Sequence, residues 1–153
     1  MQTNLAPEFK GTREGEAAEA ILRKCVHCGF CTATCPTYQL LGDELDGPRG
    51  RIYLIKQVLE GHAPTRATQL HLDRCLTCRN CETTCPSGVQ YGHLVDIGRK
   101  VVEAKVERPL AERALADADE MAAFFAEVSP TLIEGMMYEG DLYQLPRDFN
   151  AAH

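Results

Sequence analysis

The sequence predicts a mainly α-helical protein, and three observations support this fold class. Three stretches place apolar residues at the three- and four-residue steps of a helix. No stretch alternates apolar and polar residues over the length of a strand, so we expect few or no strands. All eight cysteines fall within two repeated blocks, and there is no tryptophan. We therefore expect cysteine-bound metal, rather than a large apolar core, to organise part of the chain.

The predicted helices lie within residues 14–24, 46–62 and 91–105. Their apolar stripes are Ala18, Ile21 and Leu22 in the first, Ile52, Ile55 and Leu59 in the second, and Leu94, Ile97 and Val101 in the third. The first stretch leads directly into Cys25. In the second, Pro48 suits a first helical turn and Gly61 is a stop signal.

Charge divides the chain. Residues 1–109 hold 14 Lys and Arg against 13 Asp and Glu, whereas residues 110–153 hold 2 against 9, a net −7. We predict a flexible segment over 1–13, a metal-binding domain over 14–109 and an acidic helical tail over 110–153. This balance excludes nucleic acid as an expected partner. The N-terminus has no apolar run, which predicts a cytoplasmic protein with reduced thiols, whose membrane contacts at the inner face are made through partners.

The tail carries its own helical pattern. Its apolar stripe consists of Ala111, Ala114, Ala118, Met121, Phe125 and Val128. Ser129 and Pro130 resemble the cap and first turn of a second short helix that ends at Gly140. Two roles stay open for the stripe, which are packing on the preceding domain and docking to a partner.

The cysteine blocks read CVHCGFCTATCP at 25–36 and CLTCRNCETTCP at 75–86. This C-x2-C-x2-C-x3-C-P spacing holds cubane iron–sulfur clusters in two-cluster ferredoxins, where the fourth cysteine of each run binds the other cluster. Pro36 and Pro86 prevent the chain from continuing directly as a helix. We therefore predict two [4Fe-4S] clusters. Their predicted ligands are Cys25, Cys28, Cys31 and Cys85 for the first, and Cys75, Cys78, Cys81 and Cys35 for the second.

Three alternatives were weighed for the cysteines. Disulfides are disfavoured in a chain without an export signal. Zinc sites use separated C-x2-C pairs and seldom add a third and fourth cysteine so closely. A catalytic cluster needs an open iron, whereas eight cysteines complete both cubes, so we expect electron transfer and no catalytic residue.

Several neighbours of the blocks have two readings. Gly29 allows either close approach of backbone to a cluster or a tight turn. His27 has no iron left to bind and is read as a loop residue. Four arginines flank the blocks, namely Arg49, Arg51, Arg74 and Arg79. Each of them either raises the reduction potential of a nearby cluster or is an ordinary solvated side chain.

At this point a resemblance is plain. The segments GDELDGPRGR and CRNCETTCPSG, together with the cysteine blocks, resemble the N-terminal ferredoxin part of the bacterial glycolate oxidase iron–sulfur subunits, up to about Arg113. The resemblance implies an α-helical ferredoxin domain, and the family's eight ligands correspond to the eight cysteines above. It implies partners that contain FAD and oxidise glycolate to glyoxylate, with a quinone or other acceptor beyond. The family's Cys-Cys-Gly motifs are not found in this chain.

Two functions stay open at this stage. The first is the electron-transfer subunit of a flavin-dependent oxidase or dehydrogenase of glycolate or a related 2-hydroxy acid. The alternative is a free-standing two-cluster ferredoxin. The chain offers no substrate site of its own, because no nucleotide-binding glycine loop and no His–carboxylate set stands out.

Overall fold

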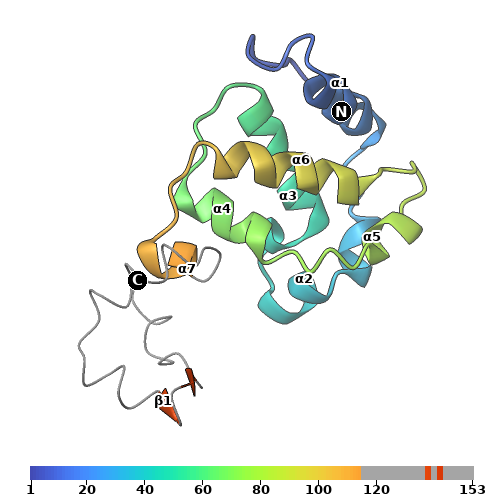
Figure 1. Ribbon diagram of the computed structural model, residues 1–153. Coiled ribbons are helices and arrows are strands. Elements are labelled where there is room, and N and C mark those ends of the chain that lie inside the picture. Colours follow the sequence, from blue (N-terminus) through green and yellow to red (C-terminus); the bar gives the residue numbers. More distant parts are fainter. Residues whose placement is uncertain (115–136, 139–140, 143–153) are drawn as a thin grey trace. The chain divides into compact units, whose positions relative to one another are not determined.

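Helices form nearly all the regular structure that the computed structural model describes, which covers residues 1–114, 137–138 and 141–142 (Figure 1). The predicted mainly helical class is confirmed. The chain divides into two units, Met1–Glu107 and Arg108–His153. The first unit contains α1 Arg13–Lys24, α2 Pro36–Leu41, α3 Pro48–Leu59, α4 Arg66–Asp73, α5 Asn80–Thr83 and α6 Tyr91–Glu103, with short 3-10 helices η1 Phe30–Thr34 and η2 Glu44–Asp46.

The core of the first unit lies where α3 and α6 cross, with α1 and α4 packed against α6. Gly98 allows the close approach of these two helices, because a Cβ placed on it would lie 2.5 Å from Cγ1 of Ile55. Eight of the nine predicted stripe residues are buried. The ninth prediction is off by one residue, since Val101 is only half-buried and Val102 fills the core.

The helix ends follow local chemistry. Thr12 caps α1 by accepting a hydrogen bond from the Gly15 amide at 3.0 Å. Pro48 occupies the first turn of α3, as predicted, and Gly61 follows this helix with φ +99°. Pro36 was expected to prevent a helix from following Cys35 directly. Instead, α2 begins at this proline, which occupies its first turn. The fixed φ of proline suits a first turn, and its missing N–H is not needed there.

The N-terminal residues differ from the expected separate segment. Leu5 and Thr3 are buried, and the Ala6 amide donates to the Leu59 carbonyl at 2.8 Å. Burial of Leu5 in the hydrophobic core outweighs the polar composition around it. Residues 1–13 therefore lie within the first unit, whose boundary at Glu107 is two residues before the expected one.

The second unit contains α7 Leu110–Ala114 and a two-stranded antiparallel pair, β1 Met137–Tyr138 and β2 Asp141–Leu142. Because Met137 pairs with Leu142 and Tyr138 with Asp141, the predicted helix ending at Gly140 is wrong at 137–138. The remaining predicted features of the tail lie outside the described residues, namely Ala118, Met121, Phe125, Val128, Ser129, Pro130 and Gly140. Within the part that the structure describes, no helix has the length and apolarity needed to cross a membrane.

Candidate metal centre

The two cysteine loops share one unusual backbone. His27 and Gly29 have φ of 58° and 87°, and the matching residues Thr77 and Arg79 have φ of 53° and 59°. Among the described residues, the only non-glycine residues with positive φ are these three, His27, Thr77 and Arg79. Such conformations cost about 1–2 kcal/mol each and concentrate at functional sites. Turns of this kind direct consecutive amides toward an anion, so both loops are shaped to surround one.

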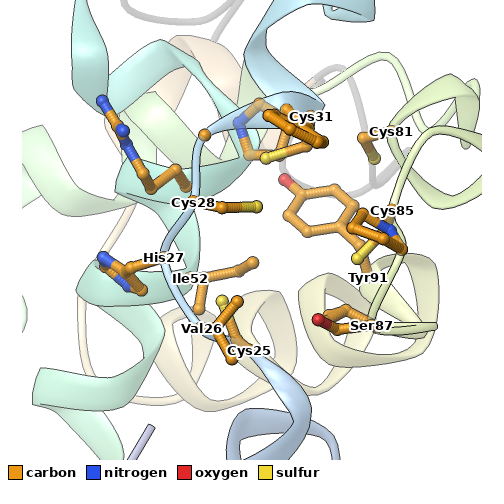
Figure 2. Close-up of a pocket in the computed structure, with 16 residues that line it drawn as sticks. Cys25, Val26, His27, Cys28, Cys31, Ile52, Cys81, Cys85, Ser87 and Tyr91 are labelled. Carbon is orange, nitrogen blue, oxygen red and sulfur yellow. The ribbon is translucent and has the colours of Figure 1, made fainter.

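The first loop borders a partly open hollow. Cys25, Cys28 and Cys31 contribute from that loop, and Cys85 reaches it from the second block. Figure 2 shows the sulfur atoms of these four residues directed toward one common space. Apolar side chains, including Ile52 and Val89, form much of the remaining wall.

A second hollow repeats the pattern with the blocks exchanged. Cys75, Cys78 and Cys81 contribute from the second block, and Cys35 reaches it from the first. Cys81, Pro48 and Tyr91 line both hollows, so the two spaces are close neighbours. All eight cysteines are free thiols, and none forms a disulfide.

The spacing of the sulfur atoms decides what size of group fits. In a tetrahedral zinc site with Zn–S bonds of about 2.3 Å, the sulfurs lie about 3.8 Å apart. No three cysteine sulfurs of the described residues lie within 4.8 Å of one another. A single ion is therefore too small for either set, whereas a multi-iron cluster suits four diverging thiols around one hollow.

Threonines and an arginine fix the loops. The Thr34 hydroxyl donates to the Asn80 carbonyl at 3.3 Å, and the Thr84 hydroxyl donates to Thr34 Oγ1 at 3.2 Å, which joins one block to the other. Arg99 on α6 donates to the carbonyls of Leu72 and Cys75 at 2.8 and 2.6 Å. These contacts hold the cysteine loops against the helical core.

The predicted arginines have different surroundings. Arg51 is 1% exposed and donates to the Thr37 hydroxyl at 3.0 Å and to Oδ1 of the buried Asp46 at 3.5 Å. Arg74 donates to the other Asp46 oxygen at 3.0 Å, and Nδ1 of His71 lies 3.0 Å from Oδ1. Arg51 borders the second hollow, so the plain solvated reading is wrong for this residue.

Arg49 borders the first hollow, and its positive charge is balanced by the carboxylate of Glu44. Its guanidinium donates to both carboxylate oxygens of Glu44, at 2.6 and 3.0 Å, and this hydrogen bonding lowers the pKa of Glu44. A Cβ on Gly29 would lie 2.6 Å from Nη1 of Arg49. Gly29 therefore serves a left-handed turn and also leaves space for this guanidinium.

Two of the cysteine thiols, those of Cys31 and Cys81, lie where burial makes ionisation costly in the absence of metal. Burial, followed by the charges of neighbouring cysteines, raises the pKa of Cys31 to about 11 and that of Cys81 to about 12. Burial also raises the pKa of Tyr91 well above its usual value, with Cys75 the next cause. The Tyr91 hydroxyl therefore keeps its proton and donates to Sγ of Cys75 at 3.5 Å.

Comparison with known proteins agrees with this geometry. Residues 21–89 match the family described as "4Fe-4S dicluster domain". Residues 21–89 are thus similar to a 4Fe-4S dicluster domain. This domain spans both cysteine blocks, which supports [4Fe-4S] clusters as the cofactor.

Two curated relatives extend over more of the chain than the dicluster domain. The glycolate oxidase iron-sulfur subunit of Escherichia coli (strain K12) is 72% identical over 117 residues, which is 76% of this chain and 29% of that protein. The probable glycolate oxidase iron-sulfur subunit of Bacillus subtilis (strain 168) is 42% identical over 99 residues, 63% of this chain and 22% of that protein. The resemblance expected from the sequence is confirmed, and the chain spans less than a third of each relative's length.

Three residues near the dicluster domain's hollows carry polar contacts that sequence reasoning missed. Tyr91 and Thr37 reach cysteine sulfurs, and Asp46 gathers two arginines and a histidine. Thr37 follows Cys35 by two residues, which is a usable local signal. Tyr91 and Asp46 lie too far along the chain from their partners for spacing to reveal them.

Proposed function

We propose that this chain binds two [4Fe-4S] clusters, each held by three cysteines of one block and the fourth cysteine of the other. The ligands would be Cys25, Cys28, Cys31 and Cys85 for the first cluster, and Cys75, Cys78, Cys81 and Cys35 for the second. The single observation that carries the proposal is the lining of the two hollows, each of which contains one of these sets. When bound, such clusters would supply one-electron transfer, and cysteine ligation of every iron would leave no open site for a substrate.

The function that fits is electron transfer within a flavin-dependent oxidase or dehydrogenase of glycolate or a related 2-hydroxy acid. Electrons would pass from an FAD-containing subunit through this chain toward a quinone or other acceptor. The similarity to two glycolate oxidase iron-sulfur subunits supports this assignment. The chain's own residues bind and orient the clusters, and we assign the 2-hydroxy acid site to a partner.

A free-standing ferredoxin is the second candidate, and one observation favours it. The first unit, Met1–Glu107, has its own helical core of α1, α3, α4 and α6, and its own residues line both hollows. In either case we place the working protein in the cytoplasm, where thiols stay reduced, with any contact to the inner face of the membrane made through partners.

Iron analysis and co-purification test these proposals. Anaerobically purified chain should be brown, absorb broadly near 400 nm and hold about eight irons from two clusters of four. A tagged chain isolated from its own cells should bring down a flavoprotein that reduces the clusters when glycolate is added. Zinc without visible absorption would overturn the cluster assignment. Full iron content with no flavoprotein partner would favour the free-standing ferredoxin.

A further inference from the structure

The two cysteine sets differ in the side chains that reach their sulfur atoms. Around Cys35, Cys75, Cys78 and Cys81, two hydroxyl groups lie against sulfur. The Tyr91 hydroxyl donates to Cys75 Sγ at 3.5 Å, and Thr37 Oγ1 lies 3.2 Å from Cys35 Sγ. Around Cys25, Cys28, Cys31 and Cys85, no side-chain hydrogen bond to sulfur is present among the described residues. In the part of the chain that the structure describes, Tyr91 is a side-chain donor to sulfur in the second set, and the Thr37 hydroxyl lies within reach of a second sulfur there.

The side-chain charges at the two hollows differ in the same direction, although the Met1 ammonium donates to the Cys25 carbonyl at 2.7 Å beside the first set. The Asp46 carboxylate, 0% exposed, contacts both Arg51 and Arg74, so this group of three carries a net charge of +1. Arg51 lies at the wall of the second hollow. At the first hollow, Arg49 is paired in a bidentate contact with Glu44, and the pair has no net charge. The buried Arg51 and Asp46 are screened by water far less than Arg74, whose side chain is 41% exposed and which carries the excess charge.

Arg51 also acts on sulfur through Thr37. Nη1 of Arg51 donates to Thr37 Oγ1 at 3.0 Å, which polarises the hydroxyl and makes it a better donor. The single Thr37 proton has two acceptors in reach, the Asp46 carbonyl at 2.7 Å and Cys35 Sγ at 3.2 Å. A metal-bound Cys35 carries no proton, so Thr37 is the donor available for this short contact. Arg51 is thus a positioning residue for the Thr37 hydroxyl.

Hydrogen bonds to cluster sulfurs and nearby positive charge both stabilise the added electron of the reduced cluster and raise its potential. Burial acts in the opposite direction, and the second set has two buried cysteines against one in the first. The Tyr91 donor, the polarised Thr37 hydroxyl, and Arg51 and Arg79 at the wall of the second hollow outweigh a difference of one buried thiol.

We propose that Tyr91, Thr37 and Arg51 make the cluster held by Cys35, Cys75, Cys78 and Cys81 the higher-potential one of the two. This inference rests on the proposed pair of clusters. When the chain takes up a single electron from a donor such as dithionite, these residues hold it at the second site. An electron that enters at the first site then moves to the second, with one cluster oxidised, the other reduced and no proton transferred. Electrons would accordingly leave this chain from the side of the second loop.

Redox titration of the full chain, with both clusters loaded and followed by EPR, tests the proposal. Tyr91→Phe removes one hydroxyl and keeps the ring in the core. We expect the equilibrium constant for reduction of the higher-potential cluster to fall about tenfold, a shift of about 59 mV for one electron, with the lower potential unchanged. Thr37→Val should shift the same potential in the same direction. Tyr53→Phe is the matched control, because Tyr53 is 46% exposed and makes no contact with sulfur.

The outcomes separate the possible failures. A shift of the lower potential, or of neither, would overturn the proposal. If Tyr91→Phe fails to fold, the Thr37→Val result alone decides between these outcomes. A wild-type chain that binds less than eight irons would instead contradict the proposed pair of clusters, and iron analysis shows this before any titration.

Discussion

The guanidinium of Arg99 holds the backbone of Cys75, with Nη2 donating to its carbonyl oxygen at 2.6 Å. The same side chain donates to the carbonyls of Leu72 and Asp73, where α4 ends. A buried helix end must have its carbonyls paired, and a cation is favourable there. Arg99 therefore connects α6 to the beginning of the second cysteine loop, which makes the loop's position depend on the helical core.

Replacement of Arg99 by methionine should loosen this loop. Hydrogen bonds to a charged group contribute about 1.5–3 kcal/mol, so we expect the free energy of unfolding to fall by about that amount. Iron should also be lost faster to a chelator, which the decay of visible absorption measures. The control is Lys100→Met, since Lys100 is exposed and pairs at the surface with Glu14, a contact worth about 0–1 kcal/mol. Equal iron loss in both variants would contradict the role of Arg99.

Sequence reasoning succeeded where periodicity or spacing encodes the structure. The stripes of α1, α3 and α6 follow from burial of one helical face, and eight of their nine residues lie in the core. The error at Val101 is a matter of helical phase, because Val102 lies in the core and Val101 packs against its edge. The cysteine blocks carried the cofactor class by spacing alone, and the dicluster match supports it.

The contacts around the cysteines could not be predicted from the sequence, because most of them join segments that are distant along the chain. Asp46 meets Arg74 and His71 only once α4 packs beside α3 and η2. The Tyr91 hydroxyl meets Cys75 because α6 starts between the two hollows. Burial of Leu5 likewise depends on a core to which distant helices contribute. Such relationships depend on helix packing angles, which local patterns leave undetermined.

Gly29 offers a test of close packing beside the first hollow. Alanine at this position would adopt φ +87° and place its Cβ 2.6 Å from Arg49 Nη1, so the Arg49–Glu44 pair must shift. Gly88 is the matched control, because it has φ +61° with no atom within 4 Å of an added Cβ. Gly88→Ala should cost about 1–2 kcal/mol from the left-handed conformation alone. Thermal unfolding should show a larger loss for Gly29→Ala, and equal losses would contradict the role of the guanidinium contact.

Serine variants of the fourth cysteines test the exchange of ligands between blocks. Cys35 lines the hollow of Cys75, Cys78 and Cys81, although it follows Cys31 in sequence. Cys35→Ser should therefore damage the second cluster and spare the first, whereas Cys85→Ser should do the reverse. Iron content and paired EPR spectra of the reduced variants measure this. If each variant lost the cluster formed by its own block, the cross-ligation would be wrong.

Low pH should weaken cluster assembly, because protons compete with iron for the cysteine thiols. Cys31 and Cys81 have pKa values raised to about 11 and about 12, first by burial and then by neighbouring cysteines, so both are protonated near neutral pH before metal binds. Ligands bind iron as thiolates, and loading must therefore release protons. Fewer protons compete as pH rises from 6 to 8, and iron occupancy at limiting iron and sulfide should increase over this range. Anaerobic reconstitution at fixed ionic strength, with proton release followed in weak buffer, measures both effects. Occupancy that stays constant across this range, with no protons released, would show that the thiols are already ionised in the metal-free fold.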